Sequence, residues 1–526
     1  MEFNNLDTLE SYWKLQQLYR QDLWYGSPEA REMENLRIDS GGGLTYYYGA
    51  KLLSEKTLQT LEELAEEQQL IAKYRLLLSG DIMNTGENRM VLHHLLRGEP
   101  AGKPQQKIKE YRNFYLRELE KLETFCENIH RGKITGSTGK AFDTVVQIGI
   151  GGSDLGPRAL YLALENLADQ QGFRKMKAHF ISNVDPDDAA SVLQGVNPET
   201  TLFILVSKSG TTQETLVNRR IVLEHLQVNA SSVDPKKHFL AVTSKSSPLA
   251  SSEDILESFY IDDYIGGRYS STSCVGGTVL SLAYGFDTFR KLLSGAAEAD
   301  KKALEPRIQQ NAALTDALTG IFERNILGYR STALLPYSQA LLRFPAHLQQ
   351  LDMESNGKQV NRRGEPVSYP TGPVVFGEPG TNGQHSFYQL LHQGTDIIPL
   401  QFIGFKESQR VFPAASAGAE SQKALLANLA AQIAAFTRGR PSKDGNKNFP
   451  GGRPAGLLLG KRLTPEALGA LLAHYENKIM FQGFCWNINS FDQEGVQLGK
   501  VLAGDILAGK TDDSLLKSLS SVVFSE

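Results

Sequence analysis

The sequence predicts an α/β protein built from two sandwich units, each with a mainly parallel sheet between layers of helices. Three observations lead to this prediction. The chain has 526 residues, which is too long for one hydrophobic core. Short apolar segments alternate with helical patterns in two separate stretches, as is typical of parallel sheets covered on both faces. With 41% hydrophobic and 22% charged residues, the composition is that of an ordinary globular protein.

Residues 1–125 are expected to form a mainly helical segment that packs on the core. Apolar residues such as Leu58 and Leu61 recur there at helical spacing, with Glu and Gln between them. A glycine-rich turn at residues 38–44 leads into a short predicted strand at residues 46–48.

The first α/β unit is predicted over residues 126–290. It opens with a buried-type strand that runs directly into a glycine loop, and Pro157 suits the first position of the helix that follows. The expected strands are residues 145–150, 179–182, 201–207 and 238–243. The expected helices are residues 158–167 and 212–226, and a mixed strand-and-turn segment follows at residues 259–269.

The second α/β unit is predicted over residues 291–510, with a helical tail over residues 511–526. A helical stretch at residues 286–328 leads into it. The expected strands are residues 332–335, 374–376 and 397–405. The expected helices are residues 338–350, 386–392, 421–436 and 465–481. Residues 441–456 are rich in Gly, Pro, Lys and Asn, which predicts an exposed loop.

Charge and cysteine usage exclude several classes of protein. The net charge is −4 and the pI is near 6.3, so no general basic field favours nucleic acid or an anionic membrane. Three cysteines without CxxC spacing indicate a reducing compartment and no disulfide framework. We see no signal-peptide pattern at the start and no apolar run of membrane-spanning length. The expected location is therefore the cytoplasm.

The first glycine loop, Gly149 to Gly156, is a candidate anion site. It follows a strand and opens a helix, but Asp154 stands where the dinucleotide fingerprint needs glycine, and the Gly-Lys-Ser/Thr ending of a P-loop is absent. Free N–H groups at a helix start, with the Ser153 hydroxyl, can still bind an anion. Taken alone, these glycines could equally serve close packing.

The second loop, residues 207–214, follows the next buried strand and strengthens the anion hypothesis. Thr211 and Glu214 have capping-box spacing, and a cap needs only one hydroxyl. Ser207, Ser209 and Thr212 are therefore surplus to capping. Hydroxyl and N–H groups at a helix start suit a phosphomonoester. Because both loops follow strand ends, they lie where open α/β sheets bind ligands.

A carboxylate and an imidazole occupy glycine-rich turns further along the chain. Glu354 lies in the turn Glu-Ser-Asn-Gly, and His385 follows the loop at residues 377–383. Glycine turns let the backbone approach a ligand closely. Proton abstraction next to a carbonyl needs such a base, together with a cation or hydrogen-bond donor near the developing oxyanion.

Six stretches together resemble the glucose-6-phosphate isomerase family, in the expected order and over most of the chain. They are GIGGSDLGP, SKSGTTQET, GGRYSSTS, LDMESNGK, GEPGTNGQHSFYQLLHQGT and NSFDQEGVQLGK. The first two also resemble the wider sugar-isomerase (SIS) domain class. The resemblance implies two SIS-type domains and interconversion of glucose 6-phosphate and fructose 6-phosphate through a cis-enediol, with no metal and no coenzyme. It also implies a homodimer whose site is completed by His385 of the neighbouring subunit.

The resemblance further implies a role for each site residue. Glu354 matches the base that moves the proton between C2 and C1, and Arg268 matches the arginine that steadies the enediolate. His385 and Lys500 match the groups that open the sugar ring. The residues implied in substrate or phosphate binding are Gly152, Ser153, Ser207, Lys208, Ser209, Thr212, Gln350 and Gln493.

Two other functions remain open from the sequence. One is a phosphosugar isomerase with broader substrate choice, for example one that also accepts mannose 6-phosphate. The other is a non-catalytic phosphosugar-binding protein, and the joint presence of Glu354, His385 and Lys500 argues against it. The sequence departs from the family at residues 271–275, where a Trp-containing run is common, and at Glu494, where an aromatic residue is usual.

Overall fold

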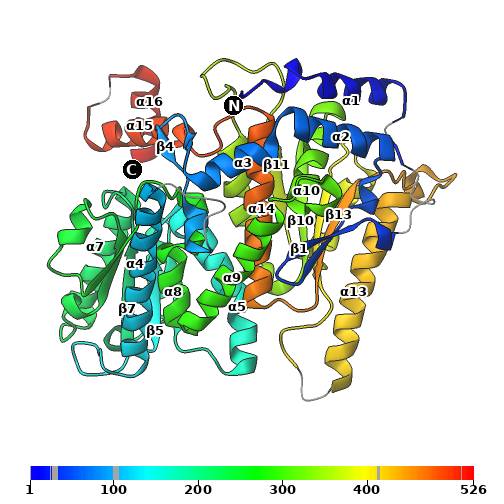
Figure 1. Ribbon diagram of the computed structural model, residues 1–526. Helices are drawn as coiled ribbons and strands as arrows, with labels where there is room; N and C mark the ends of the chain where they lie inside the picture. The colour runs from blue at the N-terminus through cyan, green and yellow to red at the C-terminus, as the bar shows by residue number, and fades with distance from the viewer. Residues whose placement is uncertain are drawn as a thin grey trace.

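The computed structural model describes residues 2–23, 25–26, 33–98, 106–411, 415–510 and 512–525. These residues form two main sheets that lie side by side, with helices around and between them (Figure 1). The predicted fold class, α/β with mainly parallel sheets, is confirmed. Among the described helices, none combines the length and the apolar character that crossing a membrane requires.

The first sheet has five parallel strands in the order β6-β5-β7-β8-β9. They are β5 (Thr144–Ile148), β6 (Lys177–Ile181), β7 (Thr201–Val206), β8 (Phe239–Thr243) and β9 (Glu257–Tyr260). Helices α5 (Leu155–Gln171), α6 (Pro186–Leu193) and α7 (Gln213–Asn229) connect the first four. Because side chains alternate along a strand, Phe203 and Leu205 pack with α6 and α7, whereas Leu202 and Ile204 join the main core.

The second sheet has six strands in the order β1-β2-β13-β12-β10-β11. They are β1 (Arg37–Gly41), β2 (Leu44–Tyr47), β10 (Ser331–Tyr337), β11 (Val374–Gly377), β12 (Leu400–Phe405) and β13 (Ala455–Gly460). The last four are parallel, and the β1–β2 hairpin pairs antiparallel with β13 through Tyr47 and Leu457. Helices α12 (Tyr388–Gln393) and α13 (Ala415–Arg438) cover one face.

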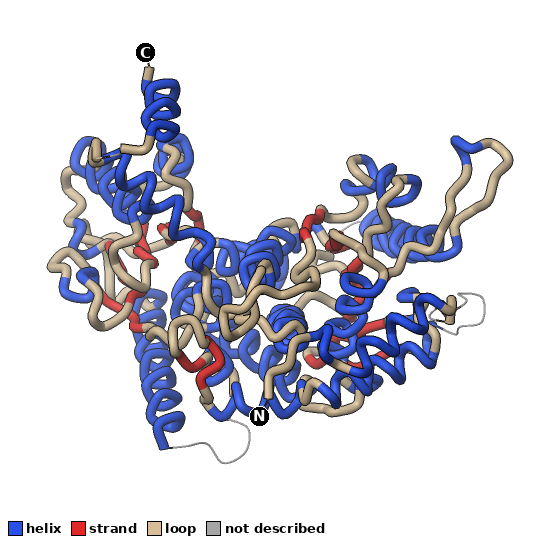
Figure 2. The backbone as a smooth tube through the Cα atoms, turned by 90° about the horizontal axis from the view of Figure 1, so that it is seen from above, coloured by secondary structure: helices blue, strands red, loops and turns tan. Residues whose placement is uncertain are grey.

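A buried helix joins the two halves of the molecule. Helix α14 (Pro465–Cys485) packs along α9 (Phe286–Lys302) and against α10 (Ala312–Ile321). Nearly all of its side chains are buried, so it lacks the polar face of a surface helix. The chain then emerges into α15 (Gln497–Leu507) and α16 (Ser514–Phe524), and α16 projects from the body (Figure 2).

The structure corrects several predicted elements. The short strand predicted at residues 46–48 overlaps β2, and β1 and β2 form a hairpin that extends the second sheet. Strand β13 begins at Ala455, inside the predicted loop, where a short apolar run follows a glycine- and proline-rich stretch. Helix α8 (Cys274–Tyr284) was not expected, since all its residues are buried and no polar face marks the helical period.

The predicted domain boundaries remain a prediction. Helix α4 (Gln106–His130) continues across the boundary between residues 125 and 126, and α9 continues across that between 290 and 291. The boundary at residue 511 lies outside the described residues.

Candidate active site

Glu354 ends a π-helical turn, Gln350–Glu354, that continues α11 (Phe344–Gln349). A single helix had been expected over residues 338–350. Wide π turns occur often at functional sites. The Glu354 side chain is 18% exposed, and its Oε1 lies 3.7 Å from Nη1 of Arg268. Its buried Oε2 forms no hydrogen bond with a described residue. One carboxylate oxygen is therefore available to a substrate.

Arg268 is buried opposite this carboxylate and held by several acceptors. Its Nε donates to the Ser355 hydroxyl at 2.6 Å, and its Nη2 donates to the carbonyl oxygens of Ser490 at 2.6 Å and Asp492 at 3.0 Å. Nη1 faces Glu354 and the amide oxygen of Gln493, which is 3.5 Å away. Apart from Glu354, these acceptors are neutral, so the guanidinium keeps a positive charge directed at the space beside Glu354.

The first glycine loop lies against the Arg268 loop. A Cβ added to Gly152 would come within 2.2 Å of the Gly267 carbonyl carbon, so only glycine fits there. Gly151 has a φ of 62°, and a Cβ added to it would lie 3.2 Å from Nε2 of Gln350. The loop therefore lies next to Arg268 and the π turn. The Gln350 Oε1 is buried and, among the described residues, has no hydrogen-bond partner.

The second loop is ordered by its own hydroxyl groups. Ser207 Oγ lies 2.9 Å from Thr212 Oγ1 and accepts from the Gly210 N–H at 3.1 Å. Helix α7 begins after Thr212, so the capping box predicted from Thr211 does not form. Ser209 Oγ instead accepts from the Thr211 N–H at 3.2 Å.

Lys208 connects the second loop to the Arg268 loop. Its Nζ donates to the Ile265 carbonyl at 3.2 Å, and burial lowers the pKa of this ammonium. Lys208 and Gln493 line one small cavity together with Gly266 and Gly267. The two phosphate-loop candidates therefore both reach the segment that carries Arg268.

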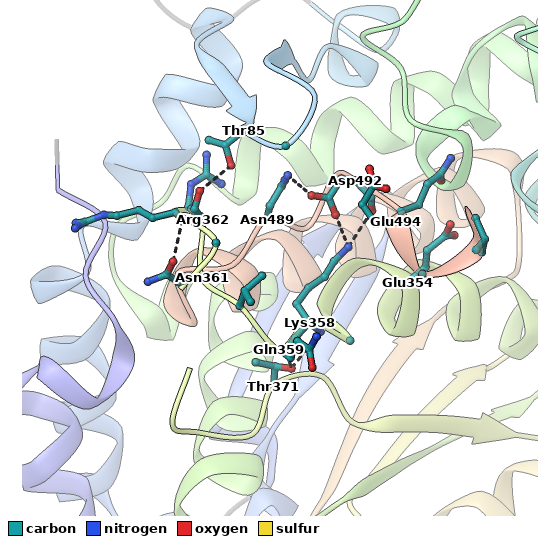
Figure 3. Close-up of a pocket in the computed structure, with 18 residues that line it drawn as sticks. Thr85, Glu354, Lys358, Gln359, Asn361, Arg362, Thr371, Asn489, Asp492 and Glu494 are labelled. Atoms are coloured by element: carbon teal, nitrogen blue, oxygen red, sulfur yellow. Dashed lines mark hydrogen bonds and ion pairs between the residues drawn. The ribbon is translucent and has the colours of Figure 1, made fainter. Parts of the chain in front are cut away.

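A larger cavity of about 820 Å³ opens beside Glu354 (Figure 3). Gln493 also lines it, so this glutamine borders both cavities. The sequence reasoning missed two other lining residues, Lys358 and Asp492, which form an ion pair at 2.5 Å. Both lie in quoted motifs, LDMESNGK and NSFDQEGVQLGK, and this membership is the signal that could have found them.

His385 and Lys500 are not brought to Glu354. His385 ends the turn Asn382–His385 after β11, and Lys500 lies in the first turn of α15. Both are exposed, and within the described part of the chain neither side chain forms a hydrogen bond or ion pair. Neither lines the cavity at Glu354. Their predicted role in ring opening remains a prediction.

The buried surroundings of Glu354 include a second carboxyl group, Asp352. Burial raises its pKa to about 6, although the nearby Lys478 ammonium opposes this effect. Asp352 Oδ1 has no hydrogen-bond partner among the described residues.

The arrangement can move a proton next to a carbonyl. Glu354 offers a free carboxylate oxygen, and Arg268 offers a fixed positive charge for the oxygen that becomes negative. The unpartnered Gln350 oxygen can accept from a substrate hydroxyl. The adjoining loops supply N–H and hydroxyl donors for a phosphate group.

Comparison with known proteins agrees with this geometry. The family described as phosphoglucose isomerase matches residues 47–523. Glucose-6-phosphate isomerase of Treponema denticola is 59% identical, over 98% of this chain and 98% of the relative. That of Borreliella burgdorferi is 45% identical over 99% of each chain. The crystal structure of a glucose-6-phosphate isomerase from Chlamydia trachomatis has a TM-score of 0.90 at 39% identity and covers 99% of each chain. The chain therefore belongs to the phosphoglucose isomerase family.

Proposed function

We propose that this chain interconverts glucose 6-phosphate and fructose 6-phosphate by proton transfer through a cis-enediol. One observation carries the proposal within the family: Glu354 has a free carboxylate oxygen and lies 3.7 Å from the buried cation Arg268. A protein that only bound phosphosugars would not need a base held beside a buried guanidinium.

Each step other than ring opening is assigned to residues around Glu354 and the two loops. Gly152, Ser153 and the 207–212 loop hold the phosphate group. Once the ring is open, Glu354 takes the proton from C2 of the aldose and returns it to C1. Arg268 faces the enediolate oxygens while they carry negative charge. Gln350 and Gln493 contact the sugar hydroxyls. One proton is abstracted and one returned, so no external oxidant or reductant is needed.

The test is a coupled assay of fructose 6-phosphate conversion without added metal, together with exchange of the substrate's C2 hydrogen with solvent. We expect both to occur in the wild type. Binding of phosphosugar with neither conversion nor exchange would instead indicate a regulatory binding protein.

We further propose that the enzyme is a cytoplasmic homodimer and that His385 and Lys500 open the sugar ring, with His385 donated by the neighbouring subunit. The exposure of His385 supports this proposal, because a histidine at the surface can reach a second chain. The described residues of α15 and α16 also include several exposed apolar side chains, which a partner could cover. They are Leu498, Val501, Leu507, Leu515, Leu519, Val522, Val523 and Phe524.

A further inference from the structure

The C-terminal part of the chain changes character at Asp492. Residues 486–491 and nearly all of α14 are buried, whereas from Gln493 to residue 510 no described residue is buried. We call residues 493–507, which include α15 and Lys500, the C-terminal arm. Asp492 is therefore the last firmly held residue before an exposed segment that carries a group assigned to ring opening.

Asp492 is held from several directions. Its Oδ1 accepts from Lys358 Nζ at 2.5 Å, and its Oδ2 accepts from the Asn489 amide at 2.5 Å. Its carbonyl oxygen accepts from Lys358 Nζ at 3.0 Å and from Arg268 Nη2 at 3.0 Å. Figure 3 shows Lys358 reaching across the cavity wall to this aspartate. Both side chains of the pair are 16% exposed, so solvent screens their attraction less than at the surface.

The pair connects two parts of the site that are distant in sequence. Lys358 lies four positions after Glu354, and Asp492 lies eight positions before Lys500. Beyond Asp492, among the described residues, the side-chain hydrogen bond between the arm and the body is that of Arg268 Nη1 to Gln493 Oε1, at 3.5 Å. The direction in which the arm leaves the body is therefore set mainly at Asp492.

We propose that Lys358 and Asp492 are positioning residues that fix the base of the C-terminal arm and so determine where Lys500 can reach. The proposal rests on the proposed function, since it concerns the ring-opening step of that reaction. Neither residue needs to touch the reacting atoms.

A different role must be distinguished. Because the Asp492 carbonyl also accepts from Arg268, loss of the pair could disturb the proton-transfer step instead. A substrate that cannot form a ring separates the two roles. 5-Deoxyfructose 6-phosphate lacks the hydroxyl that closes the ring, so its isomerisation needs Glu354 and Arg268 but no ring opening.

The experiment uses the full-length enzyme with Lys358→Met, Asp492→Asn, the double variant and the conservative Lys358→Arg. We expect kcat for fructose 6-phosphate to fall about 10- to 100-fold in each single Met or Asn variant, within the contribution of one proton-transfer group. We expect kcat for the 5-deoxy substrate to change less than threefold. Amide hydrogen exchange in residues 493–507 should become faster, and Lys358→Arg should restore most of both properties. The double variant should be no worse than either single one, because the two residues act as a unit.

Lys302→Met is the matched control. Lys302 Nζ forms an exposed ion pair with Asp39 Oδ2, at a distance of 2.8 Å, and neither residue lines the cavity beside Glu354. Equal losses on both substrates, or unchanged exchange in residues 493–507, would overturn the proposal. If the wild type does not turn over the 5-deoxy substrate, the exchange measurement decides alone. Failure of the proposed function is distinguishable, because it would appear in the wild type as no conversion of fructose 6-phosphate.

Discussion

Two parts of the site differ in how the chain holds them. The proposed proton-transfer pair, Glu354 and Arg268, lies in the interior, and Arg268 is fixed by three acceptors from two separate segments. The pair proposed for ring opening, His385 and Lys500, is exposed, and neither side chain forms a hydrogen bond or ion pair with a described residue. Under the proposed function, one folded chain holds the groups for proton transfer between C1 and C2, whereas the groups proposed for ring opening lie at the surface, where a second chain can cover them.

The largest effect is expected at the buried pair. Glu354→Gln removes the base and keeps the shape, so kcat should fall by about 10³- to 10⁴-fold while phosphosugar binding persists. Loss of C2-hydrogen exchange with solvent checks the assignment. Glu66→Gln on the exposed side of α2 (Glu55–Glu67) is the control. Undiminished exchange in Glu354→Gln would remove this residue as the base.

Arg268→Ala tests the other half of the buried pair. The enediolate would lose its fixed positive charge, so we expect kcat to fall by about 10²- to 10³-fold, with a smaller change in KM. Steady-state kinetics at saturating and limiting substrate separate the two parameters. A change confined to KM would make Arg268 a ground-state contact. Circular dichroism must accompany the kinetics, because this buried side chain also holds Ser355 and the 490–492 segment.

Burial beside Glu354 also has a cost in stability. The folded protein holds the Asp352 proton more tightly than the unfolded chain does, because burial raises its pKa from 3.8 to about 6. Its contribution to stability is therefore fully present below about pH 4 and is lost as pH rises through about 6. The loss amounts to at most about 3 kcal/mol.

Asp352→Asn replaces this carboxyl with a neutral group, so its free energy of unfolding should change less between about pH 4 and about pH 7 than that of the wild type. Urea denaturation across this range measures the difference, with Asp187→Asn on the exposed first turn of α6 as control. Parallel pH dependence in wild type and Asp352→Asn would contradict the buried-proton interpretation.

The smallest effect tests whether the exposed pair depends on a second chain. The experiment co-refolds Glu354→Gln with His385→Ala, each of which we expect to be inactive alone. If His385 acts across a dimer interface, half of the chains pair as heterodimers with one intact site each, so about a quarter of wild-type activity should return. No recovery, with heterodimers verified by mass spectrometry, would mean that each site is built within one chain.

The same contrast explains which parts could be predicted from sequence. Buried parallel strands such as β7 are continuous apolar runs, and they were found. Helix α8 was missed because burial on all sides removes its polar period. Strand β13 was missed because it directly follows a glycine- and proline-rich stretch, which predicted a loop. The N-terminal hairpin was partly predicted, as the strand near Tyr46. Its pairing with β13 could not be predicted, because the two strands are far apart in the sequence and nothing in the local sequence indicates the partner.

The site shows a similar limit. Motifs identified Glu354 and Arg268, yet their approach to 3.7 Å joins positions in different segments and is visible only in the fold. Neither the hydrophobic periodicity nor the spacing of charges in the sequence distinguishes Lys358 or Asp492. Without the motif around it, each would be interpreted as an ordinary charged residue at the surface. Thr211 had the spacing of a cap, but the cap residue is Thr212, whose hydroxyl bonds to Ser207.

The pairing of β2 with β13 has a consequence for synthesis of the chain. Tyr47 pairs with Leu457, so the hairpin cannot form its contact with β13 until the ribosome has added 410 further residues. At typical elongation rates this takes about 20 to 80 s. Throughout that time the free edge of β2, with Leu44 and Tyr46 on its apolar face, has no native partner strand. We therefore expect chaperones to bind the hairpin in nascent chains stalled before residue 455. In chains stalled well after residue 460, β13 covers the edge of β2 and this binding should be lost.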